Sequence, residues 1–206
     1  MRKSFASIHI LGADMDMVDC ALANYQLEGS RCFNSDLDSG KVGRGFLKGN
    51  AIEQISAVFD LLEKYSVKEE EFFCLNQENF ISVFSDFIKF KNVNDVAKEY
   101  FENFDCVVVS VGLLDGEIFS VNIYKEGELI DGMVIGENLQ EYGSSAREMK
   151  TDTAEKYFSL NSAELNEILK LGNCELICEK FSSALNIKLD PKEIDFKSND
   201  IEKFVY

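Results

Sequence analysis

The chain has one proline, one histidine and no long apolar run, and each shortage narrows the range of functions. A single proline in 206 residues argues against long linkers. The single histidine, His9, argues against zinc, which usually takes four ligands in two close pairs. It also argues against a cysteine nucleophile, which needs a base beside it. Because no stretch approaches the roughly 20 apolar residues of a membrane span, we expect no membrane-embedded segment.

Basic residues are scarce as well. The 21 lysines and arginines stand against 37 aspartates and glutamates, so the formal net charge is −16. A surface this negative repels nucleic-acid phosphates and anionic lipid headgroups. We therefore predict that the protein binds neither nucleic acid nor membranes, whereas it would attract a basic protein or a metal cation. An alternative interpretation is that the charge only keeps an abundant cytosolic protein soluble.

The length predicts one large domain or two small ones. The composition, 46% hydrophobic and 28% charged, is typical of a globular protein, and a chain of this length can bury about 70% of its unfolded surface. The runs FASIHIL and FISVFSDF, each followed by a helical pattern, resemble two β-α units. We predict a single compact unit over 1–206. The alternative is a subdivision into 1–76, 77–150 and a helical segment over 151–206.

Six cysteines occur without a secretory signal before them. The first apolar run is short, contains His9 and ends at Asp14, which is unlike a signal peptide. We therefore expect a cytoplasmic protein whose reduced thiols behave as small buried hydrophobes. One predicted helical core stripe consists of Cys174, Ile177, Cys178, Phe181 and Leu185.

Alternating and helical patterns predict a mixed structure in the first half of the chain. Strands are expected at 3–11, 72–75 and 80–84, and helices at 12–29, from 50 onward and at 92–104. Asp14 and Asn50 are the expected N-caps of the first two helices.

Residues 106–135 predict a three-stranded antiparallel β-meander, the clearest pattern in the sequence. A two-residue first loop would pair Leu114 with Glu117, and a three-residue loop would pair Leu113 with Glu117. We favour the second register because it gathers one apolar face and gives Gly116 a left-handed position. The residues of that face are Val107, Val109, Val111, Phe119, Val121 and Ile123.

The second turn of the meander fits a two-residue loop at Glu126-Gly127. This loop would set Ile130 and Val134 beside Ile123 and Phe119. It would leave polar residues on the opposite face, namely Ser120, Asn122, Tyr124 and Asp131.

The last quarter of the chain predicts helices. Capping-box spacings begin at Asp152 and Asn161, a break falls at 172–173, and Asp190-Pro191 is a further start signal. The predicted fold is α+β, with an antiparallel sheet packed by helices on one face and a helical C-terminal segment.

The run GADMDMV after the first strand resembles the D-x-D-x-[TV] motif of haloacid-dehalogenase-like phosphotransferases over about twelve residues. The resemblance implies that Asp14 is a nucleophile, Asp16 an acid/base, and that both hold Mg²⁺. However, Gly12-Ala13 separates strand from motif, and no downstream lysine or paired-aspartate segment follows. We interpret the aspartates as the acidic first turn of a helix. His9 is expected to be a half-buried structural residue.

Asn34, Asp36 and Asp38 have the alternate spacing of a calcium loop. An EF-hand needs glycine at position six and glutamate at position twelve, where this chain has Ser39 and Gly45. The EF-hand interpretation fails. A looser cation site or a polar turn remains.

The run SGKVGRGFLKGN (39–50) concentrates glycine and basic residues just before a predicted helix start. Backbone N–H groups and the helix dipole would suit an anion there, although the run is neither a Walker motif nor G-x-G-x-x-G. The alternative is a glycine-rich connector without a ligand. The residues of the anion site would be Lys41, Gly43, Arg44, Gly45 and Lys48.

No complete catalytic constellation is found, and G-x-S-x-G is absent. The leading hypothesis is a non-catalytic interaction protein that binds a basic protein partner, as small acidic inhibitors or immunity proteins do. The alternative is an enzyme or sensor for a phosphorylated small molecule that uses residues 40–50. No cofactor is expected, and an exposed sheet edge would permit homodimerisation.

Overall fold

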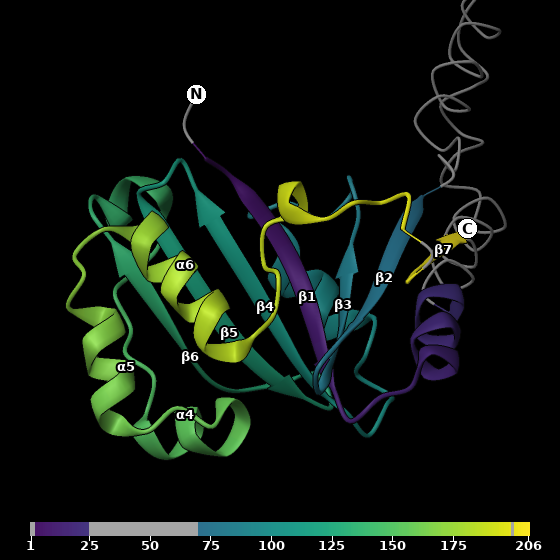
Figure 1. The fold of residues 1–206 in the computed structure, drawn as a ribbon, viewed down its shortest axis with the longest axis horizontal. Coiled ribbons are helices and arrows are strands. Elements are labelled where there is room, and N and C mark those ends of the chain that lie inside the picture. The colour runs from purple at the N-terminus through teal and green to yellow at the C-terminus, as the bar shows by residue number, and fades with distance from the viewer. Residues whose placement is uncertain (1–2, 25–69, 199) are drawn as a thin grey trace, which may run out of the picture.

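The structure is a computed structural model that describes residues 3–24, 70–198 and 200–206. Within these residues, the centre is a seven-stranded antiparallel sheet of order β6-β5-β4-β1-β3-β2-β7 (Figure 1). The strands are β1 (Phe5–Leu11), β2 (Glu71–Gln77), β3 (Phe80–Phe84), β4 (Val107–Leu114), β5 (Ile118–Lys125), β6 (Glu128–Gly136) and β7 (Ile201–Val205). With the helices around it, this sheet makes the protein an α+β fold, as the sequence predicts.

Helices cover both faces of the sheet, which corrects the prediction that they pack on one face. The helix at residues 15–24 and α3 (Val93–Glu99) lie on one side. On the other side are α4 (Thr151–Phe158), α5 (Ser162–Leu169) and α6 (Cys174–Leu185), with α6 crossing β4 and β5 (Figure 1). The physical reason lies in β1, which buries six consecutive residues, so both of its faces are covered.

The two faces form separate hydrophobic cores. On the α6 side, Phe181 packs edge-on against Phe119 and Phe158, with ring centroids 5.9 and 5.3 Å apart. The predicted cysteine stripe of α6 is buried here. On the α3 side, Val96 and Ala97 belong to one buried cluster with strand residues and with the helix at 15–24. The sheet is therefore held by burial on both sides.

The strand order brings distant parts of the sequence together. β1 lies between β3 and β4, and the C-terminal strand β7 pairs with β2, with Phe204 opposite Phe72. The C-terminal segment is helical as predicted, but the sequence patterns missed β7. The division of the chain into domains stays a prediction.

The first meander turn adopts neither predicted register. Asp115 and Gly116 both have positive φ, 52° and 68°, and the Glu117 N–H donates to the Leu114 carbonyl at 2.9 Å. Leu114 then pairs with Ile118, so Glu117 is an extra residue in the loop. The favoured prediction is two residues out of register. It still gives the correct face, because side chains alternate with a period of two.

The second turn is the predicted two-residue loop, with φ of 50° at Glu126 and 72° at Gly127. The register then shifts by one residue, because Tyr124 pairs with Leu129 whereas Ile123 pairs with Asp131. Ile130 is therefore the extra residue of a β-bulge. Asp131 takes the place opposite Ile123 that was predicted for Ile130, so it does not lie on the opposite, polar face as predicted. Ile135 takes the place opposite Phe119 that was predicted for Val134, and Met133 lies opposite Val121.

The structure confirms some, but not all, of the helix starts predicted in the C-terminal segment. The capping box at Asn161 is confirmed, since its Oδ1 accepts from the Glu164 N–H at 3.1 Å and Glu164 Oε2 accepts in return at 2.9 Å. Asn173 caps α6, and Asp190 caps η2 (Pro191–Glu193). The cap predicted at Asp152 is wrong, because that residue lies inside the first turn of α4. Another short helix, η1, spans Leu139–Tyr142.

Among the described residues, no helix has the length and apolar character needed to cross a bilayer.

Candidate functional site

Several predicted sites lie outside the described residues. They comprise the anion-site residues Lys41, Gly43, Arg44, Gly45 and Lys48, and the cation-site candidates Asn34, Asp36 and Asp38. These sites stay predictions.

The two aspartates after β1 occupy different positions on one helix. Asp14 is its N-cap, since Oδ1 accepts a hydrogen bond of 2.8 Å from the Met17 N–H. Asp16 is exposed. Among the described residues, no group of three or more histidine, cysteine, aspartate or glutamate side chains is placed to hold a metal ion.

His9 is fully buried in β1, not half-buried as predicted. Ser7 Oγ donates to the Leu189 carbonyl at 3.1 Å, so it accepts from His9 Nε2 at 2.9 Å. His9 Nδ1 therefore accepts from Ser82 Oγ at 2.7 Å, and Ser82 in turn accepts from Gln77 Nε2. Burial lowers the pKa of His9 to about 3. The imidazole is thus a neutral, fully hydrogen-bonded link between strands and has no access to a substrate.

The buried cysteines are poor nucleophiles. Burial raises the pKa of Cys74 and Cys178 to about 12 and that of Cys106 to about 11. A thiol reacts as its thiolate, so these three are inert near neutral pH. Their positions favour the core role that the sequence predicts.

A buried polar cluster lies on the α3 side of the sheet. The sequence indicated a polar face at Asn122, but not the burial of this residue or its partners. Asn122, 4% exposed, donates to Asn94 Oδ1 at 2.8 Å, and Ser110 donates to the same oxygen at 2.7 Å. Arg147 donates to Asn122 Oδ1 and to the Gly132 carbonyl. A Cβ at Gly132 would lie 2.5 Å from a backbone oxygen, so only glycine fits beneath the guanidinium. This network fastens the chain around Arg147 to the sheet.

The outer edge of β6 is covered along only part of its length. Val134 exchanges backbone hydrogen bonds of 2.8 and 3.1 Å with Arg147, and the Gly132 carbonyl accepts from the Arg147 side chain. Asp131 accepts from the N–H of Lys150 at 3.0 Å. The strand start, 128–130, lies beyond this cover.

The uncovered start of β6 exposes apolar side chains. Leu129 is 47% and Ile130 is 39% exposed. Lys125 and Glu128 close the two-residue hairpin, so the next pair, Tyr124 and Leu129, is of the non-hydrogen-bonded kind. The backbone N–H and C=O of Leu129 therefore point away from β5. This strand end offers a donor, an acceptor and two apolar side chains to a neighbour.

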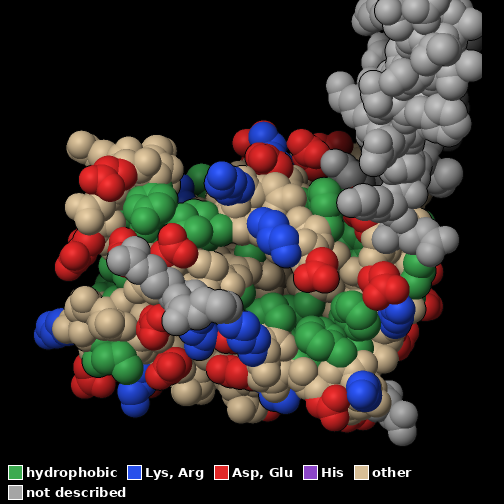
Figure 2. Space-filling view, turned by 90° about the horizontal axis from the view of Figure 1, so that it is seen from above, with side chains coloured by type: hydrophobic (Ala, Val, Ile, Leu, Met, Phe, Trp, Pro, Cys, Tyr) green, Lys and Arg blue, Asp and Glu red, His purple; other side chains and the backbone are tan. Residues whose placement is uncertain are grey.

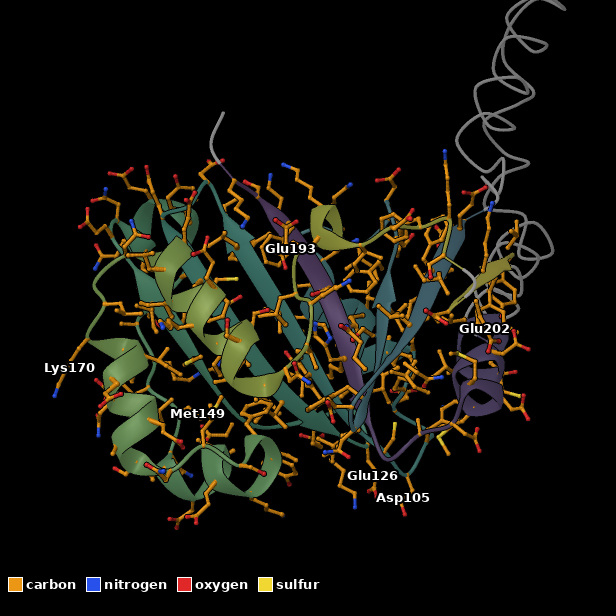
Figure 3. All side chains as sticks on the ribbon, in the orientation of Figure 1. Asp105, Glu126, Met149, Lys170, Glu193 and Glu202 are labelled. Carbon is orange, nitrogen blue, oxygen red and sulfur yellow. The ribbon has the colours of Figure 1, made fainter. Side chains whose placement is uncertain are left out.

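Carboxylates surround this strand end. Asp105 and Glu126 extend from the same end of the molecule (Figure 3). A Cβ built at Gly127 would lie 3.0 Å from the Glu102 Cβ, which places that residue against the turn. We call this region the acidic edge surface and define it by Glu102, Asp105, Glu126, Glu128, Leu129 and Ile130.

Lys125, the last residue of β5, lies beside the acidic edge surface. Lys125 Nζ is 3.1 Å from Asp105 Oδ1, and this hydrogen bond and the attraction between the two charges raise the pKa of Lys125 above its ordinary value. Glu102, Glu126 and Glu128 are exposed around it. The surface therefore keeps a negative excess that would attract basic side chains.

No protein-family model, no curated protein and no solved structure matches the chain.

The sequence indicates only part of the acidic edge surface. The charge of −16 and the Glu126-Gly127 turn indicate a negative hairpin, but the bulge that turns Ile130 outward has no glycine or proline to mark it. A pattern read with strict alternation places Ile130 in the core.

Proposed function

We propose that the protein is a non-catalytic binding protein that docks a basic protein partner on the acidic edge surface, in the manner of an immunity or inhibitor protein. The observation that carries this proposal is the open start of β6, where exposed Leu129 and Ile130 lie among carboxylates. An open strand end with apolar side chains would otherwise be an aggregation hazard.

The physical basis is strand addition combined with charge attraction. A partner strand would bond to the Leu129 backbone and cover the side chains of Leu129 and Ile130. Basic residues on the partner would lie near Glu126 and Glu128, which speeds association and orients the partner. A second copy of this chain is a weaker candidate, because its own carboxylates would meet the same charges.

Within the described residues, the burial of His9, Cys74, Cys106 and Cys178 fits a structural role better than a catalytic one. His9 and three of the cysteines are sealed from solvent, and their shifted pKa values follow from burial. These groups stabilise the sheet.

The test uses a peptide of alternating lysine and valine as a model partner, with a glutamate and valine peptide for comparison. Fluorescence anisotropy should show binding of the lysine peptide only. Glu126→Lys with Glu128→Lys should weaken it about tenfold, because two attractive charges become repulsive. The matched control is Glu155→Lys with Glu167→Lys, which changes the net charge equally on α4 and α5.

A pair of variants at one position separates strand addition from simple charge attraction. Leu129→Pro removes the outward N–H, and Leu129→Ala keeps it while removing the same apolar contact. We expect the proline variant to bind the lysine peptide more weakly than the alanine variant. Equal affinities, or equal losses in the two charge-reversal pairs, would contradict the proposal.

A further inference from the structure

A second feature lies at the opposite end of the sheet, where β1 and β3 separate. Their pairing starts at Ile8 with Val83 and continues to Leu11 with Phe80. The three residues before Ile8 pair only with β4. A hollow of about 690 Å³ opens in this fork. Such a volume lies within the range of small-molecule pockets.

Five phenylalanines line the hollow. Phe196, from the C-terminal segment, packs on Phe73 with ring centroids 4.7 Å apart and approaches Phe84 at 6.3 Å. Phe5 and Phe90 also line the hollow. Phe196 is 37% exposed, whereas Phe84 is 1% exposed. One ring of the wall is therefore accessible to a ligand, and its neighbour is fixed in the core.

The loop that closes the hollow on one side is preformed. Lys89 N–H donates to Asn92 Oδ1 at 2.7 Å, and Asn92 Nδ2 donates to the Phe87 carbonyl at 3.0 Å. Ser85 Oγ accepts from the Phe87 N–H, and its carbonyl accepts from the Ile88 N–H. These bonds fix the loop in place, so a ligand would meet an ordered wall.

Lysines line the mouth of the hollow in a chain that is otherwise strongly acidic. Lys89, Lys91 and Lys192 belong to its lining together with Asp86 and Asp190. Seen from above, hydrophobic side chains lie open at this end with lysine and acidic side chains around them (Figure 2).

The two carboxylates are engaged differently. Asp190 is buried, and its Oδ2 lies 3.2 Å from Lys3 Nζ while its Oδ1 accepts from the Lys192 N–H. Asp86 is fully solvated and only 3.8 Å from Lys89 Nζ, a separation at which an exposed ion pair is weak. Among the described residues, no carboxylate other than Asp86 forms an ion pair with Lys89 or Lys192, so we take their ammonium groups as available to an incoming anion.

We propose that this hollow binds a free amphipathic carboxylate, with an acyl or aromatic body against the phenylalanines and the acid group beside Lys89 and Lys192. Charge complementarity selects this ligand, because the mouth is basic while the chain as a whole is acidic. The proposal does not depend on the partner-binding function, which uses other residues.

Four ligands test the proposal by calorimetry below their micelle concentrations. They are decanoate, decanol, decylammonium and acetate. We expect decanoate to bind about tenfold more tightly than decanol, and acetate not to bind. The net charge of the protein alone would favour decylammonium, so decylammonium binding as tightly as decanoate overturns the proposal.

Variants then locate the binding site. Lys89→Glu with Lys192→Glu should remove the preference for decanoate over decanol, while Lys98→Glu with Lys170→Glu serves as the control of equal charge. Phe196→Ala should weaken decanoate and decanol alike, about tenfold. Binding that is unchanged in both the lysine pair and Phe196→Ala places the ligand elsewhere and also overturns the proposal.

Discussion

The two ends of the sheet present apolar surface in opposite electrostatic settings. At one end, Leu129 and Ile130 lie among carboxylates on an open strand. At the other, Phe196 lies in a hollow whose mouth carries Lys89 and Lys192. The net charge of −16 agrees with the carboxylates at the first end but gives no indication of the lysines at the second. Partner selection therefore depends on the local arrangement of charges.

The largest expected effect is on stability, and it differs between the buried ring of Phe84 and the accessible ring of Phe196. Phe84→Ala should lower the free energy of unfolding by about 3–5 kcal/mol, because it leaves a cavity in the core. Phe196→Ala should lower it by only about 1 kcal/mol, since that ring is already partly exposed. Urea denaturation measures both. Similar losses would show that both rings serve the fold equally.

The next effect concerns the turn that presents the acidic edge surface. Gly127→Ala should cost about 2 kcal/mol, because alanine is strained at φ 72° and its Cβ would press on Glu102. Gly143→Ala is the control, with φ 67° and open space, and should cost about 1 kcal/mol. Thermal unfolding compares them. An equal cost would mean that the turn does not pack on Glu102.

Salt should weaken binding at the two ends of the sheet to different degrees. Raising the ionic strength from about 0.05 M to about 0.5 M should weaken the lysine peptide about tenfold, because exposed charges are screened. Decanoate should lose less than about threefold, since most of its affinity comes from apolar contact. Titrations at both salt concentrations measure this, and a peptide indifferent to salt would contradict the charge mechanism.

The smallest effect depends on pH. Asp131 is partly buried, which opposes ionisation, but hydrogen bonds from the Thr153 side chain and from the backbone of Gly132 and Lys150 outweigh this and lower its pKa. The carboxylate therefore stabilises the fold above its unfolded pKa, near 4, and this contribution disappears as the pH falls through the lowered folded value.

Asp131→Asn should accordingly cost about 1 kcal/mol at neutral pH and progressively less below about pH 4. Asp152→Asn, at an exposed position, is the control. Unfolding curves across this pH range measure the difference. A constant cost at every pH would show that the charge of Asp131 is irrelevant.

Local sequence patterns predicted most of the elements but not their long-range placement. The capping box at Asn161 and the Glu126-Gly127 turn depend on neighbouring residues, so the sequence suffices for them. The place of β1 between β3 and β4, and the pairing of β7 with β2, are non-local and left no local pattern.

The candidate sites show the same limit. The acidity of the β5–β6 hairpin could be foreseen, whereas the bulge at Ile130 could not, because it requires no special residue. The hollow combines β1, the loop after β3 and Phe196, which are distant in sequence. Only the fold brings its phenylalanines and lysines together.

The pairing of β7 with β2 has a consequence for the order of folding. β7 ends at Val205, and the Tyr206 hydroxyl donates to the Asp19 carbonyl at 3.1 Å. Because β2 and β7 are distant in the sequence, their pairing closes a long loop, whereas each hairpin of the meander closes a short one. We therefore expect β7 to join the sheet after the hairpins have formed.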